Sequence, residues 1–260
     1  MRKLLTEKNL NGPGLVAFIF SFIVVELYFV SPIYFIIKYN NKYIKKKHIP
    51  IVQIFINLLN CSTYVIIALK GTGDFQNFLT NIIGVILCLI VILELWLSLS
   101  KRKNSNYILP IFLISNIIFQ IYYYIFKTFS SKEKIFEIIT TLINILMYAS
   151  LNIGVFYAFK EKKADRIPFL SAILGLLSSL GWTTYSIISK DEDKSHADII
   201  TLASNATSFI VLIIPIASYI YLSKKYKNNQ IQNNANEENS EKKKIDLGNK
   251  ELEEEEGGDD

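Results

Sequence analysis

The sequence predicts an all-α membrane protein with seven transmembrane helices, arranged as two parallel three-helix bundles joined by a linking helix. Two observations predict this fold: seven apolar stretches separated by short charged loops, and a pattern in the first half that recurs in the second. A hydrocarbon core about 30 Å thick needs about 20 apolar residues per helix. Soluble buried helices do not recur seven times at that length, so the pattern indicates a membrane protein.

Each apolar stretch is long enough to span a bilayer. The stretches cover residues 15–37, 50–69, 75–99, 107–129, 135–159, 169–188 and 199–222. The first is too long for the apolar region of a signal sequence and no small-residue cleavage site follows it, so we interpret it as a spanning helix. The predicted units are a first repeat at 14–99, a linking helix at 107–129 and a second repeat at 135–222.

Basic residues in the loops predict the orientation. Alternate loops carry fifteen Lys and Arg on one side of the membrane and nine on the other, and the richer side is the cytoplasmic one. We therefore expect the C-terminus in the cytoplasm and the N-terminus outside, as an odd number of helices requires. Residues 223–260 are almost wholly polar, which predicts a disordered, charged cytoplasmic tail.

The two halves of the chain share landmarks at a nearly constant offset. These are Ser31, Pro50 and Tyr64 in the first half, and Ser150, Pro168 and Trp182 in the second. The serines are 119 residues apart and the prolines 118, and each proline precedes its aromatic residue by 14. Because four helices separate equivalent points, the two repeats lie parallel in the membrane. Such repeats are typical of secondary transporters that hold substrate near mid-membrane between them.

Polar and aromatic side chains fall on matching helix faces in the two repeats. The second helix carries Asn57, Asn60 and Tyr64 on one face, and the sixth carries Ser178, Trp182 and Tyr185. Asn81 in the third helix and Asn205 in the seventh add one amide from each repeat. An amide in hydrocarbon costs free energy unless it finds a partner, so we expect these side chains to face the bundle interior.

This set of side chains suits a sugar. Aromatic rings stack on the apolar face of a pyranose, and an amide offers both a donor and an acceptor to neighbouring hydroxyls. An anion suits it badly, because no Arg or Lys lies in the middle of any span. The alternative is that the asparagines only join helices and that Trp182 only packs.

The remaining chemical groups favour a transporter over an enzyme. Glu26 lies near the centre of the first helix, either as a protonated, helix-bonded acid or as a proton-coupling site. Both histidines lie in loops, and the sequence has no Cys/His cluster for a metal and no Gly-rich phosphate loop. We therefore expect no enzyme activity, no cofactor and no metal, and nothing indicates nucleic acid.

At these residues the chain resembles the SWEET family of sugar facilitators, over roughly residues 14–222. The first-repeat motif of the family appears as Ser31-Pro32, Ile49-Pro50 and Leu58-Leu59-Asn60-Cys61. The second-repeat motif appears as Tyr148-Ala149-Ser150-Leu151, Lys160-Glu161-Lys162, Pro168-Phe169 and Trp182-Thr183-Thr184-Tyr185-Ser186.

The resemblance implies roles for particular residues. Asn81, Asn205, Tyr64 and Trp182 would hold the sugar, and Pro32, Pro50 and Pro168 would act as hinges for alternating access. Asp191 would be an outer-gate acid beside Tyr185. Leu151 replaces the helix-five proline, so one hinge is missing, and Ile67-Ala68 replaces the Tyr-Gly that would meet the gate acid. The position before Asn205 is Ser204 rather than proline.

The preferred interpretation is a bidirectional, energy-independent sugar uniporter for a mono- or disaccharide, embedded in the plasma membrane. One rival is a proton-coupled amino-acid transporter of the PQ-loop type, which Glu26 motivates although the chain contains no Pro-Gln dipeptide. A second rival is a seven-helix sorting or receptor protein without transport. The sugar carried, a Golgi or other internal membrane, and assembly into homo-oligomers are left open.

Overall fold

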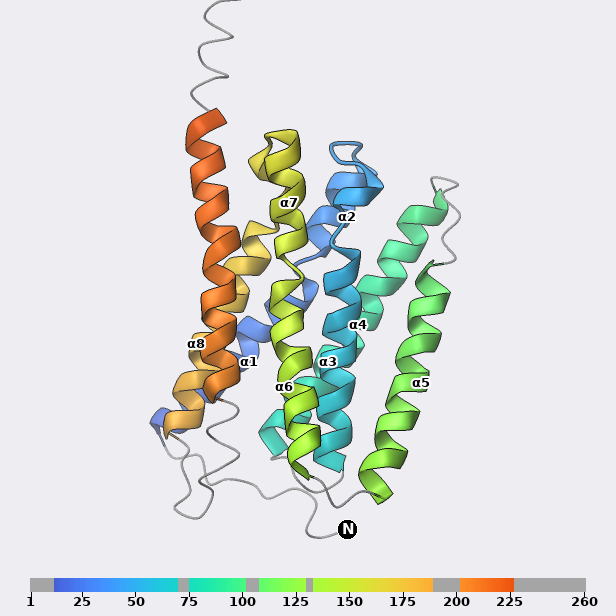
Figure 1. The fold of residues 1–260 in the computed structure, drawn as a ribbon, viewed down its shortest axis with the longest axis vertical. Coiled ribbons are helices and arrows are strands. Elements are labelled where there is room, and N and C mark those ends of the chain that lie inside the picture. The colour runs from blue at the N-terminus through green and yellow to red at the C-terminus, as the bar shows by residue number, and fades with distance from the viewer. Residues whose placement is uncertain (1–11, 70–74, 102–107, 130–132, 189–201, 227–260) are drawn as a thin grey trace, which may run out of the picture.

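A computed structural model describes residues 12–69, 75–101, 108–129, 133–188 and 202–226. It contains seven helical spans long and apolar enough to cross a bilayer, and the described residues form no strand. The prediction of an all-α protein with seven spans is confirmed. The helices run side by side along the long axis of the molecule (Figure 1).

The two repeats are built alike. The first comprises α1 (Pro13–Val30) continued by α2 (Ile33–Asn40), then the short 3₁₀ turn η1 (Lys46–His48), α3 (Ile51–Leu69) and α4 (Phe75–Lys101). The second comprises α6 (Glu133–Ala149) continued by α7 (Asn152–Glu161), η2 (Ala164–Arg166), α8 (Phe169–Ile188) and a last helix, Leu202–Tyr226. The linking helix α5 (Ile108–Phe129) stands at one edge of the bundle and the last helix at the other (Figure 1).

A serine marks the break in the first span of each repeat. The Ser31 hydroxyl donates to the carbonyl of Tyr28 at 2.7 Å, and the Ser150 hydroxyl donates to that of Met147 at 2.6 Å. A side chain that bonds back to the preceding turn bends a helix. The break in the second repeat is therefore present although Leu151 stands where a proline was expected, so losing that proline has not straightened the helix.

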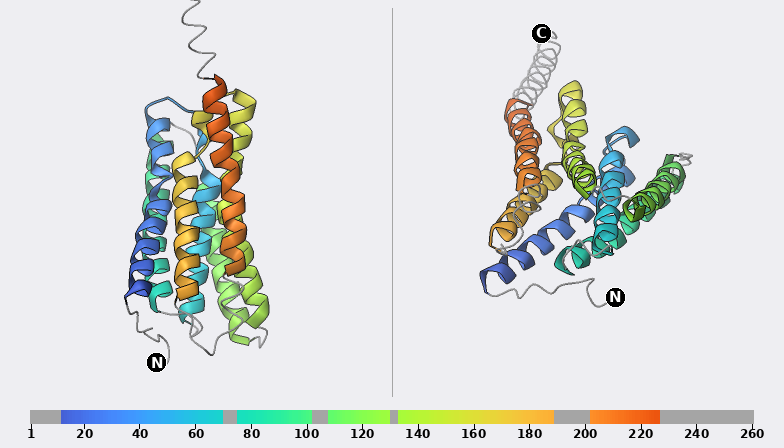
Figure 2. Two further views of the ribbon diagram at one scale, coloured as in Figure 1. Left: turned by 90° about the vertical axis from the view of Figure 1, so that its left-hand side faces the viewer. Right: turned by 60° about the horizontal axis from the view of Figure 1, so that its bottom comes forward.

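Pairs of helices from opposite repeats form the centre of the bundle. α1 packs along α8, and α6 packs along α3, as two units related by an approximate twofold axis would. In the left view of Figure 2, α8 stands between α1 and the last helix. The hydroxyls of Ser31 and Ser171 lie 2.6 Å apart and join the bend of the first repeat to α8. This 3-1-3 arrangement brings the predicted polar faces together.

Small residues let α1 and α8 approach closely. A Cβ atom on Gly181 would lie 2.5 Å from the Ser21 hydroxyl oxygen and 3.2 Å from the Ser21 Cα. Close contact of this kind between small residues is a common way to join helices where lipid offers no hydrophobic driving force. Gly181 therefore sets the distance between the two repeats.

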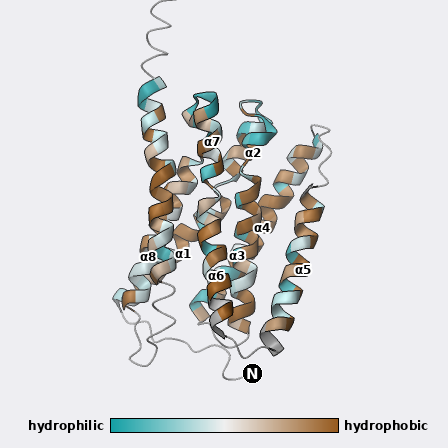
Figure 3. Cartoon of the chain, in the orientation of Figure 1, coloured by the Kyte–Doolittle hydropathy of each residue, from teal (hydrophilic) through white to brown (hydrophobic). Residues whose placement is uncertain are grey.

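Apolar side chains cover the outside of the bundle. Along α5, Ile114, Ile118 and Ile121 are more than half exposed, as expected of residues that face lipid tails. Figure 3 shows hydrophobic residues along the lengths of the helices and hydrophilic ones where α2, α7 and the last helix end. We call this the basic end, because Lys45–Lys47, Lys160, Lys162, Lys163 and Arg166 lie there.

Gly181→Val should destabilise the protein, because the added side chain would push α8 away from the backbone of α1. Overpacking of this kind costs about 1–3 kcal/mol. Thermal unfolding of the purified protein in detergent measures the effect. Thr184→Val is the matched control: Thr184 is exposed on the same helix and its hydroxyl bonds only to Leu180. Equal melting temperatures for the two variants would contradict the close approach.

Candidate functional site

A cavity of about 90 Å³ lies between the repeats, and we call it the amide cavity. Its lining consists of Val25, Phe29, Asn60, Tyr64, Asn77, Thr80, Asn81, Asn144, Met147, Tyr148, Trp182, Ser204 and Asn205. No Lys, Arg, Asp or Glu is among these described lining residues. The surface is therefore rich in amides and rings and carries no formal charge.

All four residues predicted to hold a sugar line this cavity. Tyr64 comes from α3 and Asn81 from α4, whereas Trp182 comes from α8 and Asn205 from the last helix. Each repeat thus contributes one amide and one ring, as the offset between the halves predicts. Asn81 and Asn205 are both 6% exposed, so the two amides are equally buried.

Hydrogen bonds hold the asparagines of the amide cavity in place, through the side chain of Asn81 and through the backbone of Asn205. The Nδ2 of Asn81 donates to the carbonyl of Asn77 at 2.8 Å and to the side-chain oxygen of Asn77 at 2.6 Å. The Ser179 hydroxyl donates to the carbonyl of Asn205 at 2.6 Å. Asn144 donates to the hydroxyl of Ser204 at 2.9 Å and joins α6 to the last helix. The site is therefore held in shape by bonds among its own walls.

An aromatic cluster surrounds Trp182. The Trp182 ring lies edge-on to Tyr185, with centroids 5.5 Å apart, and to Phe18, with centroids 6.4 Å apart. Tyr185, expected at an outer gate, is 3% exposed and does not line the amide cavity. Its expected partner, Asp191, lies outside the described residues.

Several lining residues were not predicted as part of the site. Asn144 has Val25 as its counterpart in the first repeat, so comparing the two halves could not identify it. Its amide lies inside a span, and that feature alone could have indicated a site residue. Ser204 was noted only as a departure from the family, and Asn60 only as a member of the polar face. Asn77 precedes Asn81 by one helical turn, and that spacing predicts their contact.

A second cavity, of about 470 Å³, opens at the basic end. Pro50 and Pro168, two of the predicted hinges, line it together with Gln53 and Leu151. Pro50 and Pro168 immediately precede α3 and α8, whereas Pro32 caps the start of α2 and does not line either cavity. The predicted hinges therefore all lie where helices begin, toward the basic end.

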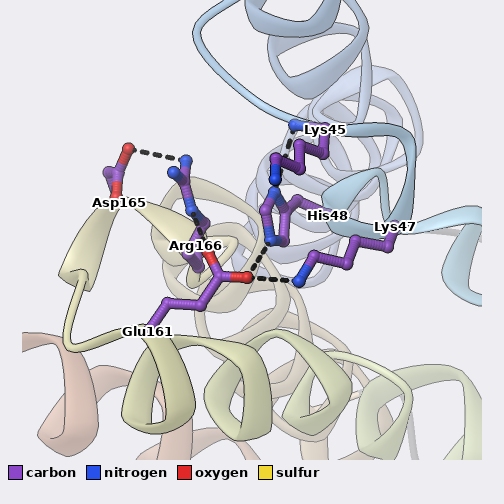
Figure 4. Close-up of polar contacts among 6 residues, drawn as sticks. All are labelled: Lys45, Lys47, His48, Glu161, Asp165 and Arg166. Carbon is purple, nitrogen blue, oxygen red and sulfur yellow. Dashed lines mark hydrogen bonds and ion pairs between the residues drawn. The ribbon is translucent and has the colours of Figure 1, made fainter.

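An ion-pair cluster joins the two repeats beside the basic-end cavity (Figure 4). Glu161, the last residue of α7, accepts hydrogen bonds from Lys47 at 2.5 Å, from His48 at 2.8 Å and from Arg166 at 3.2 Å. Lys47 and His48 belong to the first repeat, whereas Glu161 and Arg166 belong to the second. We call these four residues the basic-end clamp.

The His48 ring has a defined protonation pattern in the basic-end clamp. Its Nδ1 accepts the backbone N–H of Lys45 at 3.2 Å, so in the neutral ring Nε2 carries the hydrogen and donates it to Glu161. Burial lowers the pKa of His48 below its ordinary 6.5, and the hydrogen bond to Glu161 opposes this shift. The clamp thus contains a neutral imidazole between a carboxylate and two cations.

Glu26 lies in α1 between two lining residues without lining the amide cavity itself. Neither of its buried carboxyl oxygens has a hydrogen-bond partner in the described part of the chain. No group of three or more His, Cys, Asp or Glu that could hold a metal ion occurs among the described residues.

Comparison with known proteins reveals similarity to sugar transporters. The chain is 24% identical over 193 residues to the sugar transporter SWEET1 of Dictyostelium discoideum, a match that covers 71% of this chain and 85% of that protein. It superposes on a solved structure of a eukaryotic SWEET transporter with a TM-score of 0.62 and 17% identity, covering 82% of this chain and 97% of that one. No family model matches the chain.

Glu161→Gln should loosen the contact between the repeats at the basic end, because it removes the charge that Lys47 and Arg166 share. For a partly exposed cluster we expect a loss of about 1–2 kcal/mol, smaller at high salt. Thermal unfolding at low and high salt measures it. Asp165→Asn is the control, because Asp165 bonds Arg166 without joining the repeats. An equal loss in both variants would contradict the clamp.

Acidification should loosen the same contact through His48. Since burial holds the pKa of His48 below 6.5, the unfolded or opened chain binds a proton more readily, and stability falls as pH drops below 6.5. We expect the melting temperature of the wild type to fall between pH 7.5 and 5.5 by more than that of His48→Gln. Parallel pH curves for the two proteins would overturn this expectation. Glu161, Lys47 and Arg166 all face the His48 ring, and Glu161 is the carboxylate among them. The pH dependence of the melting temperature is therefore also measured in Glu161→Gln.

Proposed function

We infer that the chain, which resembles the SWEET family in sequence and shares the fold of a solved member, carries a sugar across the membrane. The observation that supports this proposal is the amide cavity, to which each repeat contributes one of the two predicted asparagines and one of the two predicted aromatic rings. Asn81 and Asn205 would bond the hydroxyls of the sugar, and Tyr64 and Trp182 would pack on its apolar face.

The chemistry of the cavity favours a neutral, polyhydroxylated solute. Its described lining offers amides, hydroxyls and rings but no charged side chain to neutralise an anion or a cation. A mono- or disaccharide meets these conditions, and the absence of a charged partner suits a uniporter that uses no ion gradient.

The size of the cavity supports alternating access. Sites for drug-sized ligands commonly measure about 300–1,000 Å³, whereas the amide cavity measures about 90 Å³. The repeats must therefore move apart before a sugar fits between them. Bends at Pro32, Pro50 and Pro168 would allow the basic-end half of each repeat to move, because these prolines stand at the breaks between helices, where the ladder of helical hydrogen bonds is interrupted.

The distribution of basic residues supports an orientation. The basic end would face the cytoplasm, and the amide cavity would exchange sugar with both sides in turn. We propose the plasma membrane as the site of action, with the N-terminus outside.

Proton coupling through Glu26 is the second candidate. Its buried carboxyl oxygens have no hydrogen-bond partner among the described residues, and burial of a charge is costly, which favours a protonated acid that could release its proton on opening. Flux that depends on a pH gradient and collapses in Glu26→Gln would support coupling. Unchanged flux in Glu26→Gln without a pH gradient would support uniport.

Asn81→Ala, Asn205→Ala and Trp182→Ala should each lower sugar flux at least about tenfold, the effect of losing roughly 1.4 kcal/mol of contact. Uptake of radiolabelled glucose and sucrose into proteoliposomes measures it. Trp96→Ala, on the lipid-facing side of α4 at 41% exposure, is the control and should keep its flux. No flux of any sugar in a well-folded wild type would count against a carrier.

A further inference from the structure

A wall separates the amide cavity from the basic-end cavity. On α3, Gln53 lines the basic-end cavity and Asn60 the amide cavity. On the facing helices, Met147 and Tyr148 line the amide cavity, whereas Leu151 lines the basic-end cavity. Asn60 follows Gln53 by seven positions along the helix, so the wall is about 10 Å thick.

Residues from both repeats meet in this wall. The hydroxyl of Tyr28, in α1, donates to the carbonyl of Met147, in α6, at 3.4 Å. The Tyr28 and Tyr148 rings lie 5.4 Å apart, and both are almost completely buried. A solute that passes from one cavity to the other must separate these residues.

Asn57 lies inside the wall with its amide unpaired. It follows Gln53 by four residues and precedes Asn60 by three, so all three share the face of α3 that lines both cavities. Asn57 is 0% exposed, and neither its oxygen nor its nitrogen bonds to any group in the described residues. The Gln53 amide lies beside the Tyr28 hydroxyl and is also fully buried.

An amide that only joins helices has a different environment. The Nε2 of Gln120, in α5, donates to the hydroxyl of Ser62 at 2.8 Å and to that of Thr63 at 3.2 Å, both in α3. Asn57 has no such bond, so in the closed wall an apolar residue of its shape would cost less free energy. The amide is therefore unfavourable in the described conformation, and its use must come when the wall opens.

We propose that Asn57 is a second sugar-contacting residue, which bonds the hydroxyls of the substrate as it crosses between the amide cavity and the basic end. The proposal rests on the proposed function. Opening of the wall exposes one donor and one acceptor midway along a path of about 10 Å. A sugar leaving Asn60 would then exchange its hydrogen bonds stepwise, first to Asn57 and then to Gln53, instead of losing them in an apolar constriction.

The test compares Asn57→Leu with Gln120→Leu in purified protein. We expect Asn57→Leu to melt at the wild-type temperature or above and to carry sugar about tenfold more slowly. Gln120→Leu should melt lower and keep its flux per folded molecule. The probe is whichever of glucose and sucrose the wild type carries in proteoliposomes. A lower melting temperature with unchanged flux for Asn57→Leu would make Asn57 a structural amide and overturn the proposal.

Binding to the amide cavity is followed separately. In a Trp96→Phe background, Trp182 is the remaining tryptophan, and its fluorescence reports sugar in the amide cavity. We expect Asn57→Leu to leave that affinity unchanged, whereas a matching loss of affinity and flux would place Asn57 in the first site and contradict a second one.

A second pair of variants keeps the proposal testable if Asn57→Leu does not fold. Asn57→Ser supplies a hydroxyl in place of the amide and should keep flux within about threefold of the wild type, whereas Asn57→Ala should slow it about tenfold. Equal flux in the serine and alanine variants overturns the proposal. A wild type that folds but carries no sugar refutes the proposed function itself. Normal flux in the wild type and in every Asn57 variant refutes only the role proposed for Asn57.

Discussion

A polar group inside this bundle costs free energy unless another group of the protein bonds it, because the surrounding hydrocarbon offers no partner. The paired groups hold the helices together: Ser31 of the first repeat meets Ser171 of the second at 2.6 Å, and within the second repeat Asn144 of α6 meets Ser204 of the last helix at 2.9 Å. The Asn57 amide, 0% exposed on the α3 face that runs between the two cavities, bonds to no other group of the described residues. The bonded pairs therefore belong to the fixed frame, whereas the unpaired Asn57 amide lies in the wall that would have to open for a solute to pass.

Two closures, the wall between the two cavities and the basic-end clamp, differ in their chemistry. The wall between the cavities is mainly aromatic and aliphatic, with one long hydrogen bond from Tyr28 to Met147. The closure at the basic end is ionic, with Glu161 between cations of both repeats. Salt and pH act on the ionic closure because it lies at the end of the helices, with the Glu161 side chain 22% exposed. The wall lies deeper, with Tyr28 and Tyr148 almost completely buried.

Sequence reasoning predicted the spans and the four central residues because both depend on local pattern. Span length follows from the bilayer, and Tyr64, Asn81, Trp182 and Asn205 follow from a repeat that places equivalent side chains on equivalent faces. The break at Ser150 was missed because proline was taken as its cause, whereas the serine bond is what both repeats share. The basic-end clamp and the Asn144–Ser204 pair were missed because they depend on how closely two distant segments approach, which spacing along one chain does not determine.

The strengths of the two closures fit a carrier that uses no energy source. A uniporter must populate its open and closed forms at similar free energies, because a gap of several kcal/mol would leave one form too rare to support transport. A hydrogen bond of 3.4 Å between Tyr28 and Met147 is at the weak end of the range, and an ion-pair cluster reached by solvent contributes modestly. The unpaired amide of Asn57 lowers the stability of the closed wall further. On the proposed uniport, two weak closures, one of which encloses the Asn57 amide, would keep the two forms close in free energy, and this balance would explain why an unsatisfied group is tolerated at the centre of the bundle.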